Sequence, residues 1–147
     1  ARDGLLLYGD AILVGQSSVY STDPVDVAVD YADYNFLNAV ILIESEASAE
    51  EWLVRLGAVE KELGRVRSGE RNEPRTVDID ILYAGCCIID SIDLTVPHPR
   101  WRERNFVLAP LAEMRPHLML PGEPRAVMHV WRSLIAEERV ERVIESW

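Results

Sequence analysis

Basic residues are scarce in this chain of 147 residues, and nearly all of them are arginine. Asp and Glu number 25 against 15 Lys and Arg, which gives a formal net charge of −10, and Lys61 is the only lysine. An acidic chain lacks the positive surface that displaces counterions from nucleic acid, so we expect no nucleic-acid partner. Every apolar run falls short of the roughly 20 residues that a membrane span needs, so we expect no membrane partner.

Cysteine is equally scarce. Cys86 and Cys87 are the only two, and adjacent residues seldom have the geometry for a disulfide with each other. Two free thiols indicate a reducing compartment, so we expect a cytoplasmic protein. The composition, 48% hydrophobic and 27% charged, is typical of a folded chain, and 147 residues suffice for one domain with a core.

The arginines are unevenly distributed along the chain. Half of them fall between residues 65 and 104: Arg65, Arg67, Arg71, Arg75, Arg100, Arg102 and Arg104. The guanidinium fork matches pairs of phosphate oxygens, so this concentration indicates a site for a small polyanion. Loop arginines alone are more often a solvated surface, and the interpretation therefore depends on what lies beside them.

Local patterns predict one clear helix and several strands. Ser48 and Glu51 have the spacing of a capping box, apolar residues then recur every three or four positions, and Gly64 follows, which predicts a helix over residues 48–63. Residues 11–20, 36–44 and 77–83 are rich in β-branched and apolar side chains and predict strands. Residues 65–76 are polar and aperiodic, and we expect a mobile loop there.

Two carboxylates lie close together on the third predicted strand. Asp78 and Asp80 are two residues apart, so both side chains point to the same face of a strand. Carboxylates held together repel unless a cation lies between them, and Mg²⁺ prefers one or two carboxylates with phosphate oxygens and water. An isolated pair of this kind is more often the wet face of an edge strand. The neighbouring arginines favour the metal interpretation, because metal and guanidinium groups together are what phosphoryl transfer needs.

A histidine follows in a constrained setting. Pro97 and Pro99 flank His98, which restricts the backbone on both sides of the ring. A single histidine is more often structural than catalytic, but next to a phosphate site its ring N–H is a plausible donor to a phosphate oxygen.

Five segments, taken in order, resemble one family, the 6-hydroxymethyl-7,8-dihydropterin pyrophosphokinases of folate biosynthesis. They are FLNAV at 36–40, Glu60 with GRVR at 64–67, PRTVDIDIL at 74–82, LTVPHP at 94–99 and RNFVLAPL at 104–111. The third and fourth segments together are highly specific, although either alone would be weak evidence. The resemblance runs from about residue 11 to the mid-120s.

The resemblance implies an activity: transfer of the pyrophosphoryl group of ATP, the co-substrate, to the pterin hydroxymethyl group, releasing AMP. It implies two Mg²⁺ ions held by Asp78 and Asp80, with Arg65 and Arg75 nearest the chemistry. The remaining nucleotide contacts would come from Glu60, Arg67, Ile81, Thr95, His98 and Arg104. The pterin contacts would come from Thr22, Phe36, Asn38 and Phe106. A flat heterocycle stacks on an aromatic ring, and an amide side chain can pair with its edge, which agrees with the last set.

The family fold is α+β, a ferredoxin-like antiparallel sheet backed by helices. Here residues 5–8 look like the end of the family's first helix, so we expect one domain over 1–147 that lacks the first strand and is N-terminally incomplete. Asn72 and Glu73 stand where the family usually has Trp-Gly in the mobile loop. Two alternatives stay open: a domain that binds nucleotide or pterin without turnover, and one module of a longer bifunctional folate enzyme.

Overall fold

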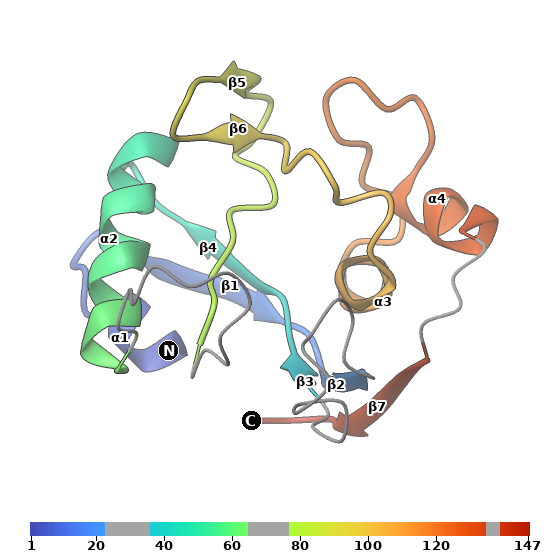
Figure 1. Ribbon diagram of the computed structural model, residues 1–147, viewed down its shortest axis with the longest axis horizontal. Helices are drawn as coiled ribbons and strands as arrows, with labels where there is room; N and C mark the ends of the chain where they lie inside the picture. Colours follow the sequence, from blue (N-terminus) through green and yellow to red (C-terminus); the bar gives the residue numbers. More distant parts are fainter. Residues whose placement is uncertain (23–35, 65–76, 135–138) are drawn as a thin grey trace.

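The structure, a computed structural model, describes residues 1–22, 36–64, 77–134 and 139–147 (Figure 1). Its helices are α1 (Arg2–Leu5), α2 (Ala49–Glu62), α3 (Asn105–Met114) and α4 (Val127–Ser133). Its strands are β1 (Ile12–Gln16), β2 (Val19–Thr22), β3 (Phe36–Asn38), β4 (Ile41–Glu44), β5 (Ile89–Asp90), β6 (Thr95–Val96) and β7 (Val140–Ile144). The predicted mobile loop at 65–76 lies outside the described residues.

The strands form small antiparallel sheets instead of the continuous strands expected at 11–20 and 36–44. β1 pairs with β4, and β2 pairs with both β3 and β7. The breaks occur at a buried corner, where Ser17 N–H donates to the Val40 carbonyl and Val40 N–H donates to Ser17 Oγ. Glu113 of α3 fixes this corner by accepting hydrogen bonds from Ser18 and from the Tyr20 hydroxyl. At this corner the chain passes from the β1–β4 sheet into the sheet that contains β2 and β3.

The predicted helix at 48–63 is confirmed as α2. Ser48 Oγ accepts the Glu51 N–H while Glu51 returns a bond to the Ser48 N–H, so the capping box is complete. Gly64 has a φ of 91°, the left-handed conformation that glycine adopts readily after a helix. The sequence pattern therefore determined both ends of this helix.

Apolar side chains pack on both sides of the sheet layer formed by β1 and β4. Leu56 and Val59 of α2, with Leu5 of α1, contact half-buried Ile41 and Ile43 of β4. On the other side, α3 and α4 form a second core that includes Trp101, Leu108, Leu111, Val127 and Val130. Figure 1 shows β1 and β4 running between α2 and α3. The fold is a mixed α+β arrangement with antiparallel sheets.

Residues 77–84 are extended but do not form the predicted strand. Burial alternates from Val77 to Asp80, and Ile79 and Ile81 pack on the same helix as β4 does. Their backbone bonds go elsewhere: Ile79 N–H donates to the Glu60 carboxylate, and the Leu82 carbonyl accepts the His98 N–H. The side-chain alternation was predicted correctly, but within the described residues no ladder joins this segment to a neighbouring strand.

The later elements complete the described fold. A turn at Gly85 leads to β5, which pairs with β6, and α3 follows. Near the end of the chain, Val140–Ile144 form β7, which pairs with β2. Among the described residues, no helix is both long enough and apolar enough to cross a membrane.

Candidate functional site

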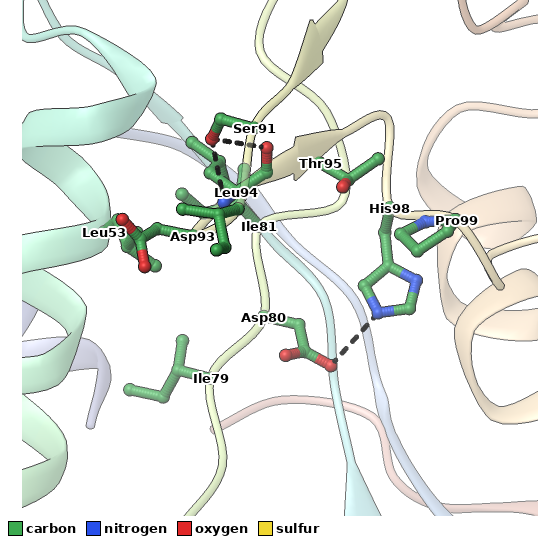
Figure 2. Close-up of a pocket in the computed structure, with 11 residues that line it drawn as sticks. Leu53, Ile79, Asp80, Ile81, Ser91, Asp93, Leu94, Thr95, His98 and Pro99 are labelled. Carbon is green, nitrogen blue, oxygen red and sulfur yellow. Dashed lines mark hydrogen bonds and ion pairs between the residues drawn. The ribbon is translucent and has the colours of Figure 1, made fainter.

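A shallow pocket opens where the extended segment 77–84 meets the β5–β6 hairpin. Its volume is about 250 Å³, and Figure 2 shows Asp80 and His98 facing each other at one side of it. The lining residues are Leu53, Ile79, Asp80, Ile81, Ser91, Ile92, Asp93, Leu94, Thr95, His98 and Pro99. Four residues predicted from the sequence, Asp80, Ile81, Thr95 and His98, are therefore brought together.

The two aspartates lie on the solvent side of the extended segment. Asp78 and Asp80 are exposed, whereas Ile79 and Ile81 between and after them turn toward α2. The buried carboxylate of Glu60, 5% exposed, accepts the Ile79 N–H at 2.7 Å. Glu60 thus holds the backbone at the residue that separates the two aspartates, a contact that sequence reasoning did not foresee.

His98 is held by its own backbone and by a hydrogen bond to its ring. Its N–H donates to the Leu82 carbonyl, and the Val96–Pro97 peptide before it is cis. The Arg100 N–H donates to Nδ1 at 3.1 Å, so the neutral ring carries its proton on Nε2, which lies 3.7 Å from Asp80 Oδ2. Burial lowers the pKa of His98, as do Arg104 and Arg100, while the Asp80 charge opposes them. The ring is thus a neutral N–H donor near neutral pH.

Arg104 connects the acidic group to an aromatic ring. Its Nη1 donates to Asp80 Oδ2 at 3.3 Å and lies 3.5 Å from His98 Nε2. The central carbon of the same guanidinium lies 5.3 Å from the centroid of the Phe106 ring. Arg104 is also the residue that precedes α3, and its carbonyl accepts the Leu108 N–H. A carboxylate, an imidazole and a guanidinium therefore converge, which suits binding of a metal–phosphate group.

A second group of predicted residues lies on β2 and β3. Asn38 Nδ2 donates to Thr22 Oγ1 at 3.0 Å, which joins two of the predicted pterin contacts. Phe36 is 38% exposed at the start of β3, opposite Thr22 in the register. Phe106, half-buried, packs against the core of α3 and α4. The ring of Phe36 is exposed, and the Asn38 amide nitrogen also donates to the Phe36 carbonyl at 3.4 Å.

Three predicted residues, Arg65, Arg67 and Arg75, lie outside the described residues. Within the described part, no group of three or more His, Cys, Asp and Glu side chains is placed to hold a metal ion. The pocket also includes Ser91 and Asp93, which the sequence prediction omitted. Ser91 Oγ accepts the Leu94 N–H and closes the bend between β5 and β6. Only the turn-forming composition of this bend could have drawn attention to them.

Comparison with known proteins gives one consistent result. Residues 5–116 match the family described as 7,8-dihydro-6-hydroxymethylpterin-pyrophosphokinase. The 2-amino-4-hydroxy-6-hydroxymethyldihydropteridine pyrophosphokinase of Bacillus subtilis is 46% identical over 99 residues, 67% of this chain and 56% of that protein. The protein of the same name from Haemophilus influenzae is 43% identical over 110 residues, 75% of this chain and 66% of that protein.

A plant relative is longer. The mitochondrial folate synthesis bifunctional protein of Arabidopsis thaliana is 32% identical over 155 aligned positions, which cover 95% of this chain and 27% of that protein. The chain thus spans from about a quarter to just under two thirds of the length of these three relatives. The family match covers most of the chain and confirms the resemblance inferred from the sequence. The chain belongs to the 7,8-dihydro-6-hydroxymethylpterin-pyrophosphokinase family.

Proposed function

We propose that this protein transfers the pyrophosphoryl group of ATP to the hydroxymethyl group of 6-hydroxymethyl-7,8-dihydropterin, releasing AMP. The observation that carries the proposal is the convergence of Asp80, His98 and Arg104 at one pocket, in a chain of this family. Phosphoryl-type transfer requires little covalent chemistry from the protein, and it proceeds mainly by positioning and charge neutralisation. These three side chains supply both requirements.

The carboxylates fit Mg²⁺. Asp78 and Asp80 offer two oxygen donors on one exposed face, and Mg²⁺ is commonly held by one or two carboxylates, with phosphate and water completing its shell. We propose two ions, which would neutralise phosphate charge in the transfer. ATP, the co-substrate, would then supply phosphate oxygens that complete the coordination of these ions.

The nucleotide contacts follow from the same pocket. His98, with its proton on Nε2, donates to a phosphate oxygen, and Arg104 adds a charged donor beside it. Ile81 and Thr95 line the pocket wall, where the base and ribose would lie. Arg65 and Arg75 are proposed to stabilise charge during transfer and Arg67 to bind phosphate, by their match to the family motif.

The pterin is proposed to bind near β2 and β3. The Asn38 amide and the Thr22 hydroxyl can pair with the polar edge of the heterocycle, and Phe36 and Phe106 offer faces on which its ring can stack. Arg104 lies over Phe106 and also contacts Asp80, so one side chain adjoins both proposed substrate positions. This arrangement would place the hydroxymethyl group toward the nucleotide phosphates.

We further propose that the chain forms a single ferredoxin-like domain. In its complete sheet a further strand would lie between β4 and residues 77–84. Ile79 and Ile81 share a helix contact with Ile41 and Ile43, yet no described strand joins the two segments by a ladder. A cavity of about 550 Å³ lies between Leu42 and Tyr83. A strand between β4 and residues 77–84 would fill it and satisfy both backbones. Exposed Cys86 and Cys87 support a cytoplasmic location, and the bifunctional relative supports fusion to another folate enzyme.

The test is product analysis with ATP, Mg²⁺ and 6-hydroxymethyl-7,8-dihydropterin. AMP in equal amount to pterin diphosphate supports the proposal, ADP would indicate an ordinary kinase, and neither product would favour a binding domain without turnover. Asp80→Ala should lower turnover by about 100-fold or more, because even outer-shell partners of a metal are worth about 10–100-fold. Asp90→Ala, an exposed aspartate on β5, is the matched control and should retain activity. Equal activity of the two variants would refute the metal assignment.

A further inference from the structure

We infer that Glu123 is a positioning residue, which acts through Arg102 to hold the segment that carries His98 and Arg104. The inference rests on the proposed function, because it assigns to a residue outside the pocket a share in nucleotide affinity. Glu123 lies in the turn before α4, outside the segments that carry the family resemblance. Its side-chain hydrogen bonds and ion pairs in the described structure go to Arg102 and Arg125, neither of which lines the pocket.

Glu123 is a buried carboxylate with two arginine partners. It is 8% exposed, and Arg102 Nε donates to its Oε2 at 2.9 Å. Arg125 donates to Glu123 through Nε at 2.8 Å, through Nη2 at 3.0 Å and through its backbone N–H at 3.1 Å. The hydrogen bonds from Arg125 and Arg102 lower the pKa of Glu123 to about 2. The carboxylate is therefore ionised and fully engaged throughout the neutral range.

The arginine that Glu123 holds lies on the segment of interest. Residues 97–104 are irregular, with short turns closed by the Trp101 and Glu103 N–H groups. Trp101, 1% exposed, anchors the middle of this segment in the core, and Arg102 stacks over its ring at 5.0 Å. Arg102 also donates to the Gly122 carbonyl at 3.2 Å. Trp101 thus fixes the middle of the segment in the core, and the turn that contains Gly122 and Glu123 fixes the next residue, Arg102.

The consequence for the pocket follows from chain connectivity. Arg104 is two residues beyond Arg102 and immediately precedes α3, and His98 lies at the opposite end of the same segment. Both side chains contact Asp80 at distances of 3.3 Å and 3.7 Å, where a shift of an ångström would break the contact. Holding Arg102 therefore limits the positions of both phosphate-binding groups, in the way that outer partners orient the ligands of a metal.

The experiment compares Glu123→Gln with two controls. Glu123→Gln preserves size and one acceptor but removes the charge, so we expect the KM for Mg-ATP to rise about 10-fold, the lower range for outer-shell partners. The kcat should change less than the KM does. Arg125→Ala removes the other partner of the same carboxylate and leaves Arg102 in place, and Glu141→Gln alters an exposed pair with Arg139. Both controls should stay within about twofold of the wild-type KM, because neither change breaks the contact between Glu123 and Arg102.

A structural readout separates this inference from the proposed function. The backbone amide resonances of His98 and Arg104 should shift in Glu123→Gln and stay in place in the two controls, whether or not the protein forms AMP. Unshifted amides and an unchanged KM in Glu123→Gln would overturn the inference. If that variant does not fold, Arg102→Ala breaks the same link from its more exposed side and must reproduce the raised KM. Wild-type protein that forms no AMP would refute the proposed function, and the amide shifts would still decide the positioning role.

Discussion

Replacing Glu60 by alanine should show how much this buried carboxylate stabilises the backbone that carries Asp78 and Asp80, without altering either aspartate. The Glu60 carboxylate is buried and accepts the Ile79 N–H at 2.7 Å, between Asp78 and Asp80. Alanine removes this acceptor and leaves the amide without its charged partner. The backbone that carries both aspartates would then lose a contact that no ladder replaces in the described structure.

The size of the effect can be estimated from its parts. A hydrogen bond to a charged group contributes about 1.5–3 kcal/mol, and this is lost. Glu60 lies in the last turn of α2, where removing a negative charge returns about 0.3–1 kcal/mol from the helix dipole. Alanine adds a few tenths through its higher helix propensity. The free energy of unfolding should therefore fall by about 1–2 kcal/mol, which is about 2–8 °C in Tm for a chain of this size.

Glu62→Ala is the matched control for this measurement. Glu62 lies in the same helix turn but is exposed, so it shares the dipole and propensity terms and lacks the bond to Ile79. Urea unfolding of both variants, followed by circular dichroism, should place Glu60→Ala lower by about 1.5–3 kcal/mol, the full hydrogen-bond contribution. Turnover should also fall in Glu60→Ala alone. Equal stability of the two variants would refute the reasoning, because the contact would then carry no weight.

Two further predictions concern the core and the titration of a buried tyrosine. Leu108→Ala should lower the free energy of unfolding by about 3 kcal/mol, because Leu108 is 0% exposed and its truncation leaves a cavity. The control Leu37→Ala, at a side chain that is 66% exposed, should change it by less than about 0.5 kcal/mol. Equal urea midpoints for the two variants would contradict this prediction. Burial and the bond to Glu113 raise the pKa of Tyr20 to about 12. The stability that Tyr20 contributes is then complete below pH 10 and is lost as pH rises through 12. The stability difference between wild type and Tyr20→Phe should shrink over that window in urea titrations at each pH.

Local sequence signals predicted the parts of the fold that depend on neighbouring residues. The capping box at Ser48 and the glycine at 64 determine α2 because both act within one helical turn. The alternation at 77–80 correctly predicted that Asp78 and Asp80 share one face, because burial has the period of an extended chain.

Non-local contacts account for what the sequence could not predict. The corner at Ser17 and Val40 breaks two expected strands because side chains from distant segments pair there. Asp80, His98 and Arg104 were expected at one site from the family resemblance, and in the structure Arg104 contacts both Asp80 and His98, which line the pocket. The contact of Glu60 with Ile79 and that of Glu123 with Arg102 join residues 19 and 21 positions apart, and no local pattern marks them.

The extended segment 77–84 has a thermodynamic consequence. Cooperative strand pairing normally makes a backbone open only when its neighbours open with it. Here the described contacts of this segment with α2 are the packing of Ile79 and Ile81 and the bond from the Ile79 N–H to Glu60. Its local opening free energy is therefore coupled to the packing of that helix. Substitutions at Leu56 or Val59, which lie on the core side of α2, would change how often the two aspartates are in place. Helix packing and affinity for the proposed Mg²⁺ would then be linked quantities.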